Sequence, residues 1–430
     1  MGRRIGAPLW LSVALLAGLA GGPAQAQVRR ITFSEAVEIA LRQNSALARA
    51  ENASELARFG VSQAQASFFP DLRLGLSDSY SFDSSLHGGG GSARAGLSSG
   101  VTLFDGLANV ANLRAAQLEE EGSGQDEERT RQTVVFDVIS GYLAMIEAGE
   151  QARVREENLA AQEKQEESVR ALVEGGERPI AELYQQQSNV AAARLARVEA
   201  RQALELSRVD LVQALQLDPA GEYDFAPPPL SEARPDSIPL ALAPVLARAF
   251  ERRPDLQAEE VRLEVARQEE RGAVAGRWPT VSLSADYGGA LDQVPSGSVG
   301  ISLSLPLFDR LNTSESIARA RIGTRNEELA LLDLRQDIAL QVRRAVLDRN
   351  AGLERLQAAE AQVLAAGKAL EFTQQRYDAG VATLYEVTLA RADHVAAVSA
   401  SVRARYNLLW QDRLLDYYVG DLDPSAGLMP

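Results

Sequence analysis

Cysteine is absent from this 430-residue sequence, and histidine occurs only twice. The absence of cysteine excludes disulfide bonds, thiolate metal sites and a lipid-anchored cysteine at the N-terminus of a processed chain. Proline is missing from two long tracts, residues 71–178 and 307–423. Because an interior proline removes a helix hydrogen bond and clashes with the preceding turn, both tracts are free to form long helices.

Long apolar runs are also missing from nearly all of the chain. The exception is residues 9–20, which follow Arg3 and Arg4 and precede the small-residue stretch GGPAQA ending at Ala26. This pattern is typical of a secretory signal peptide, here residues 1–26. Beyond it, no run approaches the ~20 apolar residues that a membrane-spanning helix requires. A membrane-crossing segment would therefore have to be built from strands.

The chain has fewer basic than acidic residues. The chain has 44 Lys and Arg against 59 Asp and Glu, and removing Arg3 and Arg4 with the leader leaves 42 basic residues and a net charge of −17. Nucleic acid is therefore not an expected partner. The hydrophobic content of 46% allows a sizeable core, so the chain is globular or membrane-associated.

The two proline-free tracts are rich in Ala, Leu, Glu, Gln and Arg, which are good helix formers. Residues 106–173 alone would span roughly 100 Å as a continuous helix. Gly122 and Gly124 lie within this tract, and each costs about 1 kcal/mol relative to Ala, so the helix is expected either to continue through them or to break locally there. Long helices are expected at residues 107–174, 179–216, 311–378 and 382–418.

The chain repeats itself. ALRQNSALARAE (40–51) pairs with AFERRPDLQAEE (249–260) at an offset of 209, and EGGERPIAEL (174–183) pairs with DAGVATLYEV (378–387) at an offset of 204. These matches predict an internal tandem repeat. The predicted organisation is a first repeat at 27–216, a surface linker with six prolines at 217–239, a second repeat at 240–420 and a tail at 421–430.

Four segments of about ten residues alternate between apolar and small polar side chains, as strands do. The strands of a soluble β-sandwich, which have one face exposed to solvent, show the same alternation. The signal peptide, the matched strand lengths and the shortage of other strands favour membrane strands, which need about 9–11 residues to cross a bilayer. The predicted strands are residues 72–82, 93–104, 280–288 and 298–307.

Four strands cannot close a barrel alone, because a membrane sheet must pair every backbone group and bacterial barrels begin at eight strands. Two chains would supply eight strands around a filled interior, and three would supply twelve around a water-filled lumen. The small Gly and Ser side chains of one face favour the wider barrel.

Several segments together resemble the TolC-like outer-membrane efflux proteins along nearly the whole mature chain. They are the repeated ALRQNSAL and AFERRPDL, FFPDLRLGLS and RWPTVSLSAD, the paired LFD, RYDAGVATLYEV and ARYNLLWQDRLLDYYVGDL. The resemblance implies an α+β membrane protein: a homotrimeric, 12-stranded transmembrane β-barrel, with four strands per chain, continuing into a long periplasmic α-helical barrel. It implies the outer membrane of a Gram-negative bacterium, with a periplasmic adaptor, an inner-membrane transporter and outer-membrane lipid as partners.

The function that the resemblance implies is a passive exit duct of a tripartite efflux pump or a type I secretion system. The two helix–helix turns would form the periplasmic tips that close the tunnel, with Tyr377 and Glu386 matching the family's aperture Tyr and first acid. The family's aperture Arg is replaced by Ala382 and its second acid by Leu389, so the polar lock is only partial. The residues expected to contact the adaptor are Gly175, Gly176, Glu177, Ile180, Gly380, Val381 and Leu384.

Glu386, Gly176 and Gly380 can also be interpreted without reference to the family. A ring of three Glu386 carboxylates at a narrow mouth would attract cations and raise the pKa of each carboxylate. The alternative is a solvated glutamate on a helix surface. Gly176 and Gly380 are predicted to adopt positive φ in the turns between antiparallel helices.

Two other functional classes have weaker support. HGGG at His87–Gly90 and GLSSG at residues 96–100 resemble hydrolase motifs, but Ser98 lies in an alternating strand rather than at a strand-to-helix elbow. No P-loop, H-E-x-x-H or EF-hand spacing is present, so no catalytic residue, metal or cofactor is predicted. A periplasmic adaptor or structural coiled-coil protein would show similar long helices but not four duplicated strands of membrane length.

Overall fold

The computed structural model describes residues 29–81, 90–226, 238–290 and 294–422. The first half comprises β1 (Arg29–Ile31), α1 (Phe33–Gln43), α2 (Ser45–Ala66), β2 (Arg73–Ser81), β3 (Gly90–Phe104), α3 (Ala108–Glu174), α4 (Ile180–Ala214) and β4 (Tyr223–Phe225). The second half comprises α5 (Leu242–Arg252), α6 (Pro254–Ala275), β5 (Thr280–Ala290), β6 (Ser296–Ser304), α7 (Asn312–Asp378) and α8 (Leu384–Val419). The predicted signal peptide and His87 lie outside the described residues.

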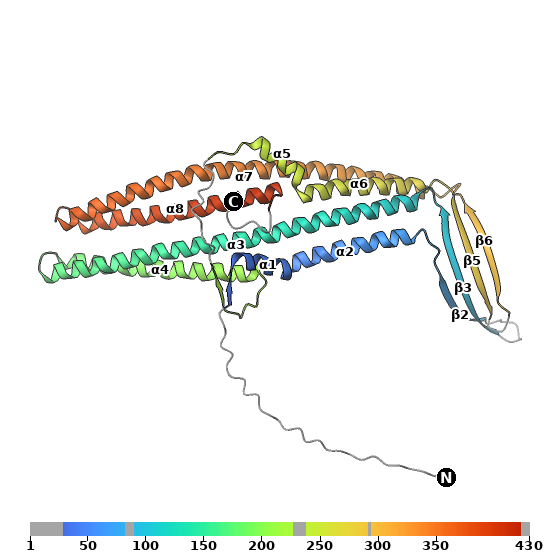
Figure 1. Cartoon of the computed structure of the whole chain (residues 1–430), viewed down its shortest axis with the longest axis horizontal. Coiled ribbons are helices and arrows are strands. Elements are labelled where there is room, and N and C mark those ends of the chain that lie inside the picture. The colour runs from blue at the N-terminus through green and yellow to red at the C-terminus, as the bar shows by residue number, and fades with distance from the viewer. Residues whose placement is uncertain (1–28, 82–89, 227–237, 291–293, 423–430) are drawn as a thin grey trace, which may run out of the picture.

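The molecule is long and narrow, with a sheet at one end and the tips of two helical hairpins at the other (Figure 1). Helices α3 and α7 have 67 residues each, so each spans about 100 Å. Helix α3 packs against α4 to form the first hairpin, and α7 packs against α8 to form the second. The shorter α2 and α6 continue alongside α3 toward the sheet.

Helix α3 passes through Gly122 and Gly124 without interruption, so the local break that the sequence left open does not form. Gly122 is buried beside Val261 of α6, where an added Cβ would lie 3.4 Å from the nearest methyl group. Burial of α3 between α2 and α6 thus outweighs the unfavourable helix propensity of two glycines.

A pair of helices, rather than one helix, precedes the strands in each half. Asn44 separates α1 from α2, and its side chain accepts hydrogen bonds from the backbone N–H groups of Ala46 and Leu47. In the second half Arg253 and Pro254 make the corresponding break, with Pro254 as the first residue of α6. Proline is well tolerated at this position because its missing N–H would have no partner there.

The linker prediction for residues 217–239 needs correction. Strand β4 lies within this range and pairs in parallel with β1, which places Ile31 opposite Phe225. Both side chains are almost fully buried in the largest apolar core, which also contains Tyr142 of α3. The hydroxyl of Tyr142 donates a hydrogen bond to the carbonyl of Ile31. The linker therefore begins with a structured segment, since alternate side chains of β4 complete this core.

The same core joins the two hairpins near the middle of the molecule. Phe136 of α3 stacks on Tyr417 of α8 with ring centroids 4.8 Å apart. The guanidinium of Arg129 lies 3.8 Å from the centroid of the Tyr417 ring and donates a hydrogen bond to the Tyr417 carbonyl. These contacts fix α3 against α8 far from the hairpin tips.

The four longer strands form one antiparallel sheet in the order β2-β3-β5-β6. The register places Leu74, Leu97 and Tyr287 side by side across three strands. It likewise aligns Val101, Leu283 and Ile301. The apolar residues of all four strands therefore share one face of the sheet.

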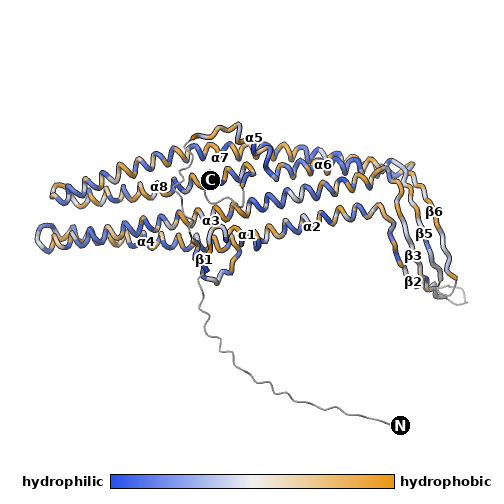
Figure 2. Tube along the Cα trace, viewed as in Figure 1, coloured by the Kyte–Doolittle hydropathy of each residue, from blue (hydrophilic) through white to orange (hydrophobic). Residues whose placement is uncertain are grey.

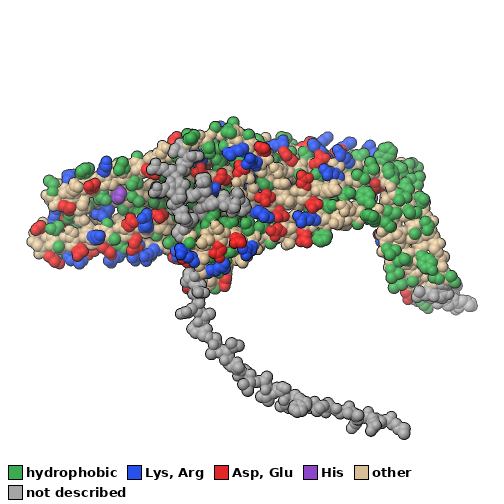
Figure 3. Space-filling model, in the orientation of Figure 1, with side chains coloured by type: hydrophobic (Ala, Val, Ile, Leu, Met, Phe, Trp, Pro, Cys, Tyr) green, Lys and Arg blue, Asp and Glu red, His purple; other side chains and the backbone are tan. Residues whose placement is uncertain are grey.

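This apolar face is uncovered in the chain. Leu76, Val299 and Ile301 expose 75%, 78% and 73% of their surface. Hydrophobic side chains cover the sheet and its junction with the helices in Figure 3. The opposite face carries small polar residues, such as Ser282 and Ser302, whose hydroxyl oxygens are 2.7 Å apart.

The helices have a different surface. Hydrophobic and hydrophilic residues alternate along all of them (Figure 2). Across the described helices, no stretch combines the length and apolar character that crossing a bilayer requires.

Candidate site at the tips of the two helical hairpins

Each hairpin turns on a glycine with positive φ. Gly176 has φ of 76° and Gly380 has φ of 77°. The N–H of Gly176 donates to the carbonyl of Val173, and the N–H of Gly380 donates to the carbonyl of Tyr377. A residue with a Cβ is strained in this backbone conformation, which explains why glycine occupies both positions.

A small apolar cluster, which we call the tip cluster, docks the two hairpins on each other. The second hairpin contributes Tyr377, Ala382, Leu384 and Val387, all no more than 5% exposed. The first hairpin contributes Val169, Val173 and Leu183. Ala382, at the position where the resemblance leads one to expect an arginine, therefore belongs to an apolar contact.

A polar contact crosses the same junction. The hydroxyl of Tyr377 donates a hydrogen bond to Oε2 of Glu182 over 3.1 Å. Arg178 pairs with the Glu182 carboxylate at 3.7 Å. The same guanidinium donates to the Tyr377 carbonyl over 3.2 Å and lies 4.6 Å from the centroid of the Tyr377 ring. We call this three-residue set, Arg178, Glu182 and Tyr377, the latch.

Burial and the latch change the acidity of Tyr377. Desolvation raises the pKa of its phenol to about 12, and the nearby Glu182 carboxylate adds to the increase. Both effects disfavour the phenolate. The hydroxyl therefore remains protonated, and able to donate to Glu182, throughout the physiological range.

Glu386 does not take part in the latch. Its carboxylate accepts hydrogen bonds from the backbone N–H and the hydroxyl of Thr383, at 2.7 and 3.1 Å. The Thr383 hydroxyl in turn accepts from the Glu386 N–H, which completes a capping box at the start of α8. These bonds, with a weaker contribution from Arg376, lower the pKa of the partly exposed Glu386 carboxyl.

A second polar bridge joins the hairpins two helical turns above the latch. The side-chain amide of Asn189 donates to the hydroxyl of Thr388 over 3.1 Å. The same amide donates to Gln186, which is almost fully buried and bonded to Gln162. The contact between the two hairpins is thus supported at more than one height.

The structure separates the predicted adaptor residues into two groups. Gly175, Gly176, Glu177, Ile180, Gly380 and Val381 are exposed at the tips. Leu384 is 3% exposed and belongs to the tip cluster, because its side chain points toward the first hairpin. Of the two predicted aperture residues, Tyr377 lies in the junction between hairpins and Glu386 on the helix surface beside it.

Sequence reasoning missed Arg178 and Glu182. The internal repeat could have identified both residues, because the offset of 204 aligns Glu182 with Glu386 and Arg178 with Ala382. The arginine absent from the second tip is therefore present at the matching position of the first.

Among the residues that the structure describes, no three Asp, Glu or His side chains are placed to hold a metal ion. Ser98 lies in the middle of β3, between Arg73 of β2 and Asp286 of β5. A nucleophile elbow needs a sharp turn from strand to helix at the serine, and that turn is not at Ser98.

Comparison with known proteins agrees with this architecture. A family model described as "Outer membrane efflux protein" matches residues 36–216 and 245–420, one segment in each half of the chain. Protein CyaE of Bordetella pertussis is 26% identical over 377 residues, which cover 85% of this chain and 79% of CyaE. The outer membrane efflux protein BepC of Brucella suis is 24% identical, with 73% of this chain and 69% of BepC covered.

The fold also resembles solved channel structures. A crystal structure of CusC superposes with a TM-score of 0.81 at 18% identity and covers 90% of this chain and 92% of its own. Its description refers to transmembrane channel formation. At this identity the likeness concerns the fold, a helical barrel with a β-barrel portion.

Proposed function

The chain belongs to the outer membrane efflux protein family, and from this we propose how its copies assemble, close and open. Membership confirms the predicted resemblance and places the protein in the outer membrane with a periplasmic extension. The protein is an exit channel for efflux or type I secretion, which rules out the alternative of a periplasmic adaptor. The family consists of transport conduits rather than enzymes.

We propose that three copies form one 12-stranded barrel in the outer membrane. In the described part of the chain, the edge strands β2 and β6 are each paired on one side only. Lipid offers no hydrogen-bonding partner to an open edge, so neighbouring copies have to supply one. The uncovered apolar face of the sheet is the observation that carries this proposal, because bilayer contact would bury it.

The two halves of the chain would each contribute one pair of strands and one hairpin. In both halves the helices before the strands have 11 and 22 residues, and the helix after them has 67. This matching supports the duplication that we infer from the sequence, with repeats at 27–216 and 240–420. Three chains would then bring six hairpins into the helical barrel.

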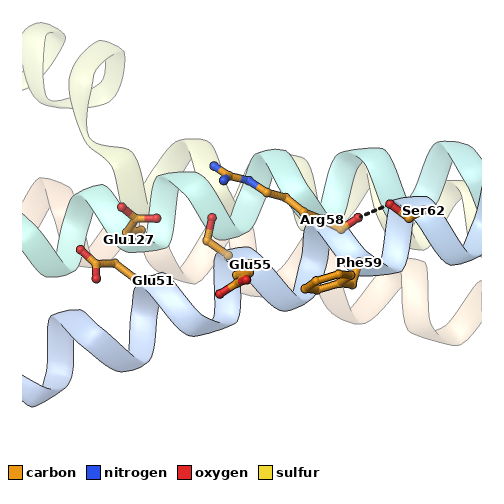
Figure 4. Close-up of a pocket in the computed structure, with 7 residues that line it drawn as sticks. Glu51, Glu55, Arg58, Phe59, Ser62 and Glu127 are labelled. Carbon is orange, nitrogen blue, oxygen red and sulfur yellow. Dashed lines mark hydrogen bonds between the residues drawn. The ribbon is translucent and has the colours of Figure 1, made fainter.

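The helices have uncovered surfaces that a neighbouring copy would bury. Leu56 and Phe59 of α2 expose 71% and 64% of their surface. Between α2 and α3 lies a groove of about 500 Å³, whose polar lining includes Glu51, Glu55 and Glu127 (Figure 4). Such a mixture of apolar and charged surface is compatible with a subunit interface, where apolar residues are buried and rim charges set the register.

We propose that the tip cluster and the latch keep the periplasmic entrance shut. Moving the second hairpin away from the first would expose Leu384 and Val387 and break the Tyr377–Glu182 hydrogen bond. Members of this family work as trimeric channels with adaptor and inner-membrane pump partners. An adaptor that contacts the exposed tip residues, such as Ile180 and Val381, would gain binding energy that offsets the lost tip contacts.

Glu386 has a secondary role in this proposal. Its carboxylate lies at the tip and its lowered pKa keeps it ionised, so three copies would present fixed negative charge to cations at the entrance. Replacing it with Gln should weaken block by cations, and unchanged block would remove Glu386 from the entrance.

The test is to extract the protein from outer membranes in detergent and insert it into planar lipid bilayers. We expect a detergent-stable trimer with a small closed-state conductance, and a larger conductance when the tip contacts are removed. Recovery as a water-soluble monomer would contradict both the barrel and the channel.

A further inference from the structure

Glu182 and Glu386 occupy the same position in their helices but have different partners. Glu182 is the third residue of α4, which follows Pro179, and Glu386 is the third residue of α8, which follows Thr383. Glu386 bonds to its own helix terminus, whereas Glu182 reaches Tyr377 on the other hairpin. The residue before each helix explains this difference.

A capping box needs two groups from the residue before the helix. Its backbone N–H donates to the glutamate at the third position, and its hydroxyl accepts from the N–H of that glutamate. Thr383 supplies both groups, at 2.7 and 3.3 Å. Pro179 has neither a backbone N–H nor a polar side chain, and α4 has no side-chain cap.

Pro179 therefore offers the Glu182 carboxylate neither a backbone N–H nor a hydroxyl at the start of its own helix. The carboxylate accepts from the Tyr377 hydroxyl at 3.1 Å and pairs with Arg178 at 3.7 Å. Pro179 also disfavours the helical conformation at the preceding residue, Arg178, whose guanidinium contacts Tyr377. Both charged members of the latch are thus directed by one residue that does not belong to it.

We propose that Pro179 is a positioning residue of the entrance: by denying Glu182 a capping box, it makes the carboxylate available to hold the second hairpin. This inference rests on the proposed closure by the latch. Pro179 would thus influence the opening of the entrance, although it makes no polar contact with the cargo or with the opposite hairpin.

The test is Pro179→Thr, which restores a capping box and changes no latch residue. Glu182 would then bond to the N–H and hydroxyl of residue 179, and its contact with Tyr377 would weaken. We expect a rise in single-channel conductance close to that of Tyr377→Phe. Pro179→Ala supplies the N–H without the hydroxyl, so it should give a smaller rise.

A purely structural role for Pro179 predicts the opposite sign. Threonine is a better residue than proline for capping a helix, so the start of α4 would become more stable and the tip tighter. The double variant Pro179→Thr with Tyr377→Phe separates the two explanations. If Pro179 acts through the latch, the double variant should conduct no more than Tyr377→Phe alone, because the contact can be lost only once.

A structural readout is independent of conductance. The sequence has no cysteine, so spin labels at Tyr184→Cys and Tyr385→Cys, both on exposed residues, occupy defined sites, and mixing labelled chains with an excess of unlabelled chains leaves the distance between the two hairpins of one chain as the measured distance. Pro179→Thr should lengthen this distance. If Tyr377→Phe opens the channel while Pro179→Thr leaves conductance and distance unchanged, or if the two effects add, the role of Pro179 is overturned. If no variant conducts at all, the proposed channel closure itself fails.

Discussion

The hydroxyl of Tyr377 donates a hydrogen bond to the carboxylate of Glu182 across 195 residues of sequence, and this bond joins the tips of the two hairpins. Around it, seven apolar residues form the tip cluster. One charge-assisted hydrogen bond and a small buried contact therefore join the hairpin tips, and we propose that together they keep the entrance shut. The two contributions are separable by mutation, as the following predictions describe.

Tyr377→Phe removes the hydroxyl of the latch and keeps the ring in the tip cluster. A hydrogen bond to a charged group contributes about 1.5–3 kcal/mol. Because Glu182 is partly exposed and can be rehydrated, we expect the lower value, which is about a tenfold shift from closed to open channel. Single-channel recording measures this shift. A conductance equal to that of the unmodified channel would show that the hydrogen bond does not hold the entrance.

Alkaline pH should open the channel through the same residue. The closed state raises the pKa of Tyr377 to about 12 from its ordinary value of 10. The closed state therefore retains a proton that the open state releases, and its stability falls as pH rises from 10 toward 12. Below pH 10 this group contributes no pH dependence. Conductance measured across this range should rise, and Tyr377→Phe should lack the transition.

Leu384→Ala tests the apolar part of the closure. Leu384 is 3% exposed, and truncation of a buried leucine costs about 2–5 kcal/mol. We expect a leaky channel and a lower thermal midpoint for the helical region. Leu364→Ala is the matched control, since Leu364 is 63% exposed on α7 of the same hairpin and does not belong to the tip cluster. Similar behaviour of both variants would contradict a specific role of the tip cluster.

Adaptor contact should depend on exposed tip residues rather than on Leu384. Ile180 and Val381 expose 59% and 69% of their surface at the two tips. Changing either to Glu adds charge to an apolar contact without disturbing the tip cluster. We expect weaker capture of the adaptor in a pull-down and an unchanged closed-state conductance. Normal adaptor capture by both variants would place the contact elsewhere.

Leu76→Lys and Ser77→Lys form a pair that tests which face of the sheet meets lipid. The two residues are adjacent in β2 and face opposite sides. A lysine on the lipid face of a barrel costs about 2–4 kcal/mol near the bilayer midplane. We expect Leu76→Lys to reduce recovery of trimer from outer membranes, and Ser77→Lys to assemble normally. If Ser77→Lys reduced recovery of trimer and Leu76→Lys did not, the face that carries Ser77 would be the one that meets lipid.

Much of the architecture follows from local patterns in the sequence. The long helices follow from the proline-free tracts, and the apolar face of the sheet follows from strict alternation in residues such as Leu74 and Leu76. Turn glycines at 176 and 380 follow from the repeat and from the positive φ that the turns require. Each of these features depends on residues within a few positions of one another.

The errors and omissions arise where distant segments meet. The glycines at 122 and 124 favour a break only if the helix is considered alone, and packing of the buried Gly122 against α6 overrides this tendency. Strand β4 has three residues, and β1, the strand it pairs with, precedes it by almost 200 positions. Glu182 has the same helix position as Glu386, so its partner on the other hairpin becomes visible only when Tyr377 is placed beside it in space.

The equal length of α3 and α7 has a consequence for how such a tunnel evolves. With 67 residues in each, both hairpins end at the same depth, so the contacts at the tips meet in register. Lengthening one hairpin by two heptads would displace its tip by about 20 Å and leave Tyr377 opposite a different part of α4. Insertions and deletions in one half must therefore be matched in the other, which couples the lengths of two gene segments that are far apart.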